Sequence, residues 1–154
     1  MPPSIQPYTG KSPIANISDG QFKTLVEQAV DARKLSYSPY SHFAVGCAIL
    51  TEDNQIVIGS NVENASYGAA ICAERTAIVK AVTSGHLLFK ALVVSTNSDS
   101  CSSPCGICRQ VIREFSGPDL KLPIVMLDNK GEKLVVMSIE ELLPVSFGPE
   151  DLVD

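Results

Sequence analysis

Three cysteines and one glutamate, in two short segments of the chain, are residue types that can hold a metal ion and activate water. Cys72 and Glu74 lie in the first segment, and Cys105 and Cys108 lie in the second. Structural zinc sites have four protein ligands, whereas catalytic zinc sites have three and leave one position for water. A nearby carboxylate can accept the proton that an activated water molecule must lose. The set therefore predicts a catalytic zinc site in which Glu74 transfers protons.

Both segments are expected to begin helices, and a helix N-terminus suits a metal-binding thiolate. The free backbone N–H groups and the helix dipole there stabilise negative charge on sulfur. Cys105 and Cys108 are separated by about one helical turn, so their sulfur atoms should lie on one face. If Cys72 is the first residue of its helix, the side chain of Glu74 can reach back past the helix end. A zinc ion beyond the ends of the two helices would then contact both segments.

Arg75 is included in the predicted site because the bound metal would carry excess negative charge. Three thiolates outweigh the charge of Zn²⁺, and electron-rich thiolates make the metal a weaker Lewis acid. A nearby cation and two helix N-termini would restore part of that acidity. Arg75 follows Glu74 directly in the sequence and is the candidate cation.

The spacing alone also leaves other interpretations open. Cys101 precedes Cys105 by four residues, so a closed structural zinc site with four cysteines is one alternative. A Cys-x-x-Cys pair at a helix start is also typical of redox-active dithiols. Cys47 alternates with apolar residues in a strand and is expected to be a core residue. Taken singly, several candidates also fit ordinary roles, namely solvated helix residues (Glu74 and Arg75), core packing (Phe43) and loop hydrogen bonds (Asn61 and Glu63).

The elements that must position these residues follow from apolar periodicity, capping signals and turns. Ser18 with Gln21, and Ser138 with Glu141, form capping boxes that predict two helix starts. The short turn at residues 128–131 forces its two flanking strands to be antiparallel. The order α-β-β-α-β-α-β-β predicts an α/β fold with a single mixed five-stranded sheet sandwiched by helices. Helices are expected near residues 18–35, 72–85, 105–115 and 138–143, and strands at 43–50, 56–60, 91–95, 124–127 and 134–137.

Composition indicates one globular domain that neither binds nucleic acid nor inserts into a membrane. The chain has 154 residues, of which 45% are hydrophobic and 19% are charged, as expected for a single packed domain. A net charge of −5 and the lack of a lysine and arginine cluster argue against a nucleic-acid partner. The longest apolar runs are far shorter than the ~20 residues that span a bilayer. Residues 1–17 contain four of the ten prolines and are expected to form a loose N-terminal arm, followed by a single domain over residues 18–154.

The cysteines and the first residues favour a cytoplasmic protein. Five cysteines are an odd and clustered set, which suits an intracellular metal site better than a disulfide framework. Residues 1–13 lack the apolar core of a secretory signal peptide. We therefore expect the chain in the cytoplasm.

Five segments of the chain together carry a family pattern. They are Cys-Ala-Glu-Arg-Thr-Ala at residues 72–77, Pro-Cys-Gly-Ile-Cys-Arg-Gln at 104–110, Ser-Pro-Tyr-Ser-His-Phe at 38–43, Asn-Val-Glu-Asn-Ala-Ser-Tyr at 61–67, and Leu-Leu-Pro-Val-Ser-Phe-Gly-Pro-Glu-Asp-Leu at 142–152. The first two segments resemble the zinc-dependent nucleoside deaminases, and all five resemble the small homotetrameric cytidine deaminases. This resemblance runs from residue 18 to residue 152 and implies their three-layer fold. It leaves Cys101 outside the ligand set, which disfavours the four-cysteine interpretation.

The resemblance implies both the metal site and the reaction. Cys72, Cys105 and Cys108 would hold one Zn²⁺ per subunit, and Arg75 would compensate their charge. Glu74 would take a proton from water, deliver it to the ring nitrogen N3, and later protonate the leaving amino group. The implied reaction is the hydrolysis of cytidine or deoxycytidine to uridine or deoxyuridine and ammonia, a step of pyrimidine salvage.

The resemblance also implies how a nucleoside would be held. Phe43 would lie against the pyrimidine ring, and the pair Asn61 and Glu63 would bind the ribose 3′-hydroxyl. The backbone N–H of Ala73 and the carbonyl of Ser103 would contact the edge of the base.

Two further residues connect the resemblance to assembly. Tyr67 and Phe147 resemble residues that reach the site of a neighbouring subunit, so the implied form is a homotetramer with shared sites. The chain departs from the family pattern in two places. Gly68-Ala69-Ala70 replaces bulkier residues, and Ala44 follows Phe43 where proline is frequent.

Three rival functions share part of this pattern. Blasticidin-type deaminases have the same three-cysteine arrangement, but Asn61, Glu63 and the segment around Phe147 favour a nucleoside substrate. Polynucleotide cytidine deaminases need a basic channel for single strands, which the acidic composition does not suggest. A non-enzymatic zinc scaffold would have no use for Glu74 beside an open metal position.

Overall fold

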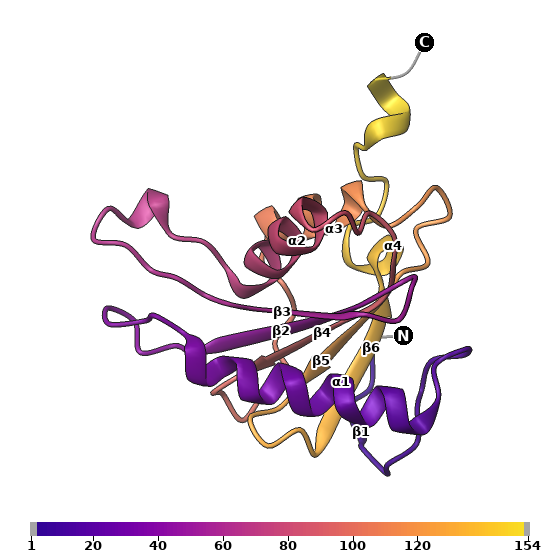
Figure 1. The fold of residues 1–154 in the computed structure, drawn as a ribbon, viewed down its shortest axis with the longest axis horizontal. Coiled ribbons are helices and arrows are strands. Elements are labelled where there is room, and N and C mark those ends of the chain that lie inside the picture. Colours follow the sequence, from indigo (N-terminus) through magenta and orange to yellow (C-terminus); the bar gives the residue numbers. More distant parts are fainter. Residues whose placement is uncertain (1–2, 153–154) are drawn as a thin grey trace.

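The computed structural model describes residues 3–152, in which one mixed sheet carries helices on both faces (Figure 1). The sheet has six strands in the order β1-β6-β5-β4-β2-β3. Strands β4 and β5 are parallel, and the other neighbouring pairs are antiparallel. The strands are β1 (Gln6–Pro7), β2 (Val45–Thr51), β3 (Ile56–Ser60), β4 (Phe89–Thr96), β5 (Pro123–Leu127) and β6 (Lys133–Ser138).

The local sequence explains how the strands are connected. Strands β2 and β3, and strands β5 and β6, form hairpins because only a short turn separates each pair. In the second turn, the Asp128 carboxylate accepts hydrogen bonds from the backbone N–H groups of Glu132 and Lys133 at 2.8 and 3.1 Å. Strands β4 and β5 are parallel because helix α3 (Gly106–Glu114) crosses between them. The central strands β2 and β4 are buried, so their sequences are nearly continuous apolar runs.

Helix α1 (Asp19–Ala32) covers one face of the sheet (Figure 1). It begins in the predicted capping box, in which the side chains of Ser18 and Gln21 each accept a hydrogen bond from the other residue's backbone. Its apolar stripe packs against residues of β2, β4 and β5. Gly46 of β2 lies under this helix, and a Cβ at that position would overlap the backbone of Ala29. The glycine therefore permits the close approach of α1 to the sheet.

Helices α2 (Ala73–Thr83), α3 and α4 (Ile139–Leu142) cover the opposite face (Figure 1). Together with the sheet they enclose a second apolar cluster, in which Cys47 is fully buried, as its strand position predicts. Helix α2 can lie close to β3 because Gly59 has no side chain. A Cβ at this position would overlap the backbone of Ala77. The two helices that begin next to the cysteines therefore rest on the same face. Among residues 3–152, three short 3₁₀ helices complete the secondary structure, at Arg33–Leu35, Tyr67–Ala69 and Pro149–Leu152.

The prediction of five strands is wrong because the N-terminal segment adds a sixth. Strand β1 pairs antiparallel with β6 at the edge of the sheet, and the next residue, Tyr8, donates its N–H to the carbonyl of Glu132 at 2.7 Å. A strand of two residues has no apolar alternation that would reveal it in the sequence. Its proline is tolerated because an edge strand does not need every N–H for pairing. Tyr8 then packs edge-on against Phe22 of α1, with 5.4 Å between the ring centroids.

Other predictions differ from the structure only in detail. The second strand of the sheet begins at Val45 and not at Phe43, because the turn residue His42 has φ 56° and delays the extended backbone. The division into an arm at residues 1–17 and a domain at residues 18–154 stays a prediction, and its outer ends at residues 1–2 and 153–154 lie outside the described residues. Within residues 3–152, none of the helices combines the length and the apolar character needed to cross a bilayer.

Candidate active site

Three cysteine sulfurs meet where α2 and α3 begin. Cys72 and Cys105 are the N-cap residues of these helices, and neither uses its thiol as a helix cap. The sulfur atoms of Cys72, Cys105 and Cys108 all lie within 4.8 Å of one another, with 3.9 Å between the first two. A tetrahedral zinc ion with Zn–S bonds of about 2.3 Å separates its sulfur ligands by about 3.8 Å. The three thiols are therefore spaced as ligands of one zinc ion.

Cys101 lies apart from this cluster. Its thiol approaches the backbone carbonyl of Lys133 at 3.7 Å, and it does not belong to the group of clustered sulfurs. A zinc ion held by three thiolates retains one position for water, as in catalytic zinc sites. Within the described residues all five cysteines are free thiols, so Cys105 and Cys108 form no disulfide. The geometry therefore favours the three-ligand prediction over the structural and redox alternatives.

Glu74 faces the sulfur cluster, although the helix register differs from the prediction. Cys72 is not the first helical residue but the extended N-cap, with φ −73° and ψ 158°. Glu74 is consequently the second residue of α2 and not the third. Because an N-cap residue lies half outside its helix, this shift still brings both side chains to the same space. The Glu74 carboxylate is 3.8 Å from the sulfur of Cys108 and only 4% exposed.

The surroundings of Glu74, Cys72 and Cys108 shift the pKa values of all three groups. Burial raises the pKa of Glu74 to about 7, and the nearby Cys72 thiolate adds to this effect. The pKa of Cys72 falls to about 5, first because Cys108 donates a hydrogen bond to it and then because of Arg75. The same hydrogen bond raises the pKa of Cys108. A guanidinium nitrogen of Arg75 lies 3.4 Å from the sulfur of Cys72, so Arg75 lies where the prediction places a compensating cation.

A cavity of about 520 Å³ lies beside the thiols and Glu74. Its lining comes from the loop before β2 and the start of that strand, the segment after β3, the start of α2, the end of β4, and the loop before α3 with the first turn of α3. The volume falls in the range of about 300–1,000 Å³ that small-molecule sites occupy. Most of the predicted substrate residues line it, namely Phe43, Asn61, Glu63, Tyr67 and Ser103.

Two predicted residues are placed differently from this group. Ala73 is fully buried as the first residue of α2 and does not line the cavity. Phe147 does not line the cavity of its own chain, and its side chain is 58% exposed. The structure of one chain therefore brings the zinc ligands, Glu74 and most substrate candidates together, but not Phe147.

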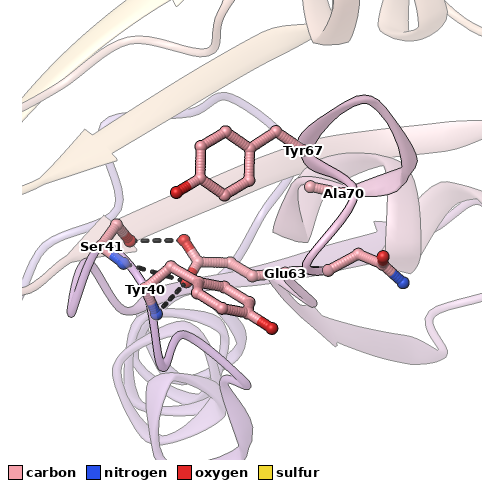
Figure 2. A pocket seen from close by; sticks show the side chains of 6 residues that line it. Tyr40, Ser41, Glu63, Tyr67 and Ala70 are labelled. Atoms are coloured by element: carbon pink, nitrogen blue, oxygen red, sulfur yellow. Dashed lines mark hydrogen bonds between the residues drawn. The ribbon is translucent and has the colours of Figure 1, made fainter.

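Asn61 and Glu63 bind the loop backbone as well as facing the cavity. The Asn61 amide accepts a hydrogen bond from the N–H of Val45 at 2.9 Å and donates one to the carbonyl of Phe43 at 2.7 Å. Figure 2 shows Glu63 receiving bonds from the backbone N–H groups of Tyr40 and Ser41, at 3.0 and 3.1 Å, and from the Ser41 hydroxyl. The ordinary role in loop hydrogen bonding is thus present for both residues. It fixes the segment that carries Phe43.

A smaller cavity of about 330 Å³ adjoins the larger one and is drawn in Figure 2. Tyr40 and Tyr67 face each other across Glu63, with ring centroids 6.0 Å apart. Tyr67 is 78% exposed, so its ring is available to another molecule. Sequence reasoning assigned no role to Tyr40, although it lies within the segment 38–43 that carries the family pattern.

Arg109 is a second residue that sequence reasoning missed. Its guanidinium donates to the carbonyls of Pro104 and Leu142, at 2.8 and 2.7 Å, and to the hydroxyl of Ser103 at 2.6 Å. It therefore ties the loop that carries Ser103 to the end of α4. Its place directly after Cys108 in the zinc segment is the signal that could have identified it.

A buried carboxylate beside three thiols, at two helix N-termini on a mixed sheet, is the arrangement of the zinc-dependent deaminases. Residues 20–122 match the family model described as the cytidine and deoxycytidylate deaminase zinc-binding region. The chain belongs to this family. The match includes the three thiols, Glu74 and Arg75, and it ends before the segment that contains Phe147.

Individual relatives agree with the family assignment. The chain is 44% identical over 128 residues to a cytidine deaminase of Sporosarcina psychrophila, covering 83% of this chain and 92% of the relative. It is also similar to the crystal structure of a cytidine deaminase from Burkholderia pseudomallei, with a TM-score of 0.76, 42% identity and coverage of 81% and 98% of the two chains. A blasticidin-S deaminase of Bacillus cereus is 34% identical, over 86% of this chain and 95% of the relative.

Proposed function

We propose that this chain is a zinc-dependent cytidine deaminase, which hydrolyses cytidine and deoxycytidine to the corresponding uridines and ammonia. The observation that carries this proposal is the buried Glu74 carboxylate beside three clustered thiols, at the side of a cavity of about 520 Å³. Zinc, when bound by Cys72, Cys105 and Cys108, supplies the positive charge that makes a water molecule nucleophilic at neutral pH. The similarity to cytidine deaminases supports the choice of substrate.

Glu74 moves the protons of the reaction. Its carboxylate accepts one proton of the attacking water and passes it to the ring nitrogen N3. It then takes the second proton, from the new hydroxyl group on C4, and delivers it to the departing amino group. A pKa of about 7, raised by burial, makes both the carboxylate and the carboxylic acid accessible near neutrality. Burial also keeps bulk water from competing for these protons. Arg75 offsets the negative charge that gathers around the thiols.

The cavity residues orient the nucleoside. Phe43 lies against the pyrimidine ring, and its backbone is held in place by the Asn61 amide. Asn61 and Glu63 face the sugar, where a carboxylate and an amide can bind a hydroxyl group. The carbonyl of Ser103 and the N–H of Ala73 contact the base edge, and Arg109 holds the Ser103 loop. These residue roles are part of the proposal, and the cavity that Phe43, Asn61, Glu63 and Ser103 share supports the roles of these four.

The active form that we propose is a homotetramer in the cytoplasm. The side chains of Tyr67 and Phe147 are exposed and therefore available for contacts between subunits. Phe147 would then complete the cavity of a neighbouring subunit. The free thiols within the described residues suit a reducing compartment. A single domain over residues 18–154, preceded by an arm at residues 1–17, remains part of the same proposal.

One assay tests the proposed function. The zinc-loaded chain is mixed with cytidine, deoxycytidine, deoxycytidylate or blasticidin S, and the ultraviolet absorbance is followed. We expect rapid conversion of the two nucleosides and little of the other two compounds. Preferred turnover of blasticidin S would instead assign the chain the activity of the blasticidin-S deaminases. No turnover of any compound would contradict the proposal.

A further inference from the structure

The C-terminal tail that follows α4 turns apolar side chains outward and polar groups inward. Figure 1 shows this tail, in yellow, extending from the side of the sheet that α3 and α4 cover. Ser146 is half-buried and Gly148 is buried, whereas Val145 is fully exposed and Phe147 is 58% exposed. Val145 lies in a turn with φ 54°, and residues 146–148 follow it before the last 3₁₀ helix begins. The inward contacts, and not apolar burial, therefore determine how the tail is held.

Arg113 of α3 makes most of these inward contacts. Its side chain is only 7% exposed, its Nε donates to the hydroxyl of Ser146 at 2.9 Å, and its Nη2 donates to the Glu150 carboxylate at 2.8 Å. A buried guanidinium requires such partners, because an unpaired buried charge is strongly unfavourable. The guanidinium occupies the space next to Gly148, so a Cβ at this position would overlap it. The tail therefore packs directly against the Arg113 side chain, without room for a side chain at residue 148.

These contacts bracket Phe147 on both sides. Ser146 precedes it, Gly148 follows it, and the amide of Gln110 donates to the carbonyl of Phe147 itself at 3.0 Å. The backbone N–H of Gly148 also donates to the Asp151 carboxylate at 2.8 Å, which stiffens the turn after it. The direction of the Phe147 side chain is thus fixed by α3, although the ring itself is largely exposed.

We propose that Arg113 is a positioning residue that holds residues 146–150 so that Phe147 points away from its own subunit and into the substrate site of a second copy. This inference rests on the proposed function, in which Phe147 completes a neighbouring cavity. Arg113 does not line the cavity of its own chain, so it acts through Phe147. Helix α3 then links the two halves of a shared site. The start of α3 carries Cys105 and Cys108. Near its other end, Arg113 holds the tail so that the Phe147 ring points toward the neighbour.

The substitution Gly148→Ala tests this role without removing any functional group. The added methyl would overlap the Arg113 guanidinium, so either the arginine or the tail must move. Gly20→Ala is the matched control, because the same methyl at that position has nothing within 4 Å. We expect Gly148→Ala to raise the KM for cytidine about tenfold while kcat and zinc content stay close to those of the parent. Gly20→Ala should change none of these quantities.

A double-mutant cycle separates positioning from a general loss of structure. If Arg113 acts through Phe147, adding Gly148→Ala to Phe147→Ala raises KM no further than Phe147→Ala alone. Additive increases in KM would overturn the positioning role. Ser146→Ala removes only the hydrogen bond to Nε, and it should show a smaller rise with the same lack of additivity, even if Gly148→Ala fails to fold.

The two proposals fail in distinguishable ways. An unmodified chain that deaminates cytidine, together with a folded Gly148→Ala chain of unchanged KM, overturns the role of Arg113 and leaves the proposed function intact. An unmodified, zinc-loaded chain without activity on cytidine overturns the proposed function, and the role of Arg113 with it.

Discussion

Glu74 is the residue on which the proposed chemistry depends, and its surroundings explain why a carboxylate serves there. Burial at 4% exposure raises its pKa to about 7, and the Cys72 thiolate nearby adds to this effect. The carboxylate also lies 3.8 Å from the sulfur of Cys108, so a proton that it takes up stays next to the metal site. A solvated glutamate at the same distance would be too weak a base to hold a proton near neutral pH.

Replacing Glu74 by glutamine should remove proton transfer while keeping the size of the side chain. We expect turnover of cytidine to fall by about 10²–10⁴-fold or more, because one group serves several transfers. Zinc content should stay near one ion per chain, and uridine affinity should change far less than turnover. Steady-state kinetics, metal analysis and uridine titration of Glu74→Gln and the parent provide the comparison. Turnover near the parental rate would contradict the mechanism, and lost zinc would make Glu74 a ligand.

Two cysteines offer a matched comparison for the metal site. Cys108→Ala should lose zinc and unfold more easily, because the metal joins the starts of α2 and α3. Cys101→Ala removes the same thiol group outside the cluster, so zinc content and activity should be retained. Metal analysis and thermal unfolding of both variants measure the difference. A zinc-loaded and active Cys108→Ala chain would assign the metal to other ligands.

At this scale the sequence predicts identities better than contacts. Spacing and residue type indicate a metal site but leave Cys101 as a possible fourth ligand, and only the family resemblance reduces the set to Cys72, Cys105 and Cys108. The position of Cys72 as N-cap depends on the backbone angles of one residue, which spacing does not specify. The hydrogen bonds of Asn61 to the backbone of Val45 and Phe43 depend on which strands adjoin, so they emerge only from the fold.

At the scale of elements, the two helix N-termini and the loop before α3 must keep a fixed relation. Helix α2 is set against β3 by Gly59, and α3 is tied to α4 through Arg109. Arg109 also fixes both Ser103 and Pro104, which immediately precede Cys105. One side chain therefore connects the substrate loop, the metal segment and the last helix.

Arg109→Ala should consequently affect both stability and substrate binding. We expect the free energy of unfolding to fall by about 2 kcal/mol, since several charged hydrogen bonds are lost at once, and KM for cytidine to rise. Lys121→Ala is the control, because it removes a cation from an exposed pair with Glu140, and exposed ion pairs contribute little to stability. Denaturant unfolding and kinetics of both variants test this. Equal, small effects would show that the Ser103 loop is held by other contacts.

Element boundaries followed from the sequence where capping side chains mark them. The boxes at Ser18 and Ser138 are formed as predicted, and α1 and α4 begin directly after them. Strand β1 was missed because it consists of two residues and its pairing partner lies at the far end of the chain. Local patterns report local structure, whereas an edge strand is defined by the sheet that it joins.

At the scale of the whole molecule, we propose that the cavity of one chain is completed by Phe147 of a neighbouring subunit. Tyr67 and Phe147 are the two most exposed aromatic residues, at 78% and 58%, whereas Phe22 is in the core. Helix α3 holds Phe147 outward through Arg113 and Gln110. An assembly in which each site combines Glu74 of one subunit with Phe147 of another would explain why Phe147 is exposed and why α3 holds it in a fixed position.

Mixing two inactive or impaired variants tests this shared site directly. Glu74→Ala removes the proton shuttle, and Phe147→Ala should raise KM and weaken the assembly. Under conditions of subunit exchange, some sites combine the Glu74 of a Phe147→Ala subunit with the Phe147 of a Glu74→Ala subunit. These sites are complete, so activity per total subunit at low cytidine should exceed the average of the separate proteins. In the control, the Glu74→Ala protein is replaced by the double variant Glu74→Ala/Phe147→Ala. The gain should then disappear, because no subunit in the mixture retains Phe147. If exchange is demonstrated, each variant alone is impaired and the mixture gains nothing, Phe147 does not contribute to a neighbouring site.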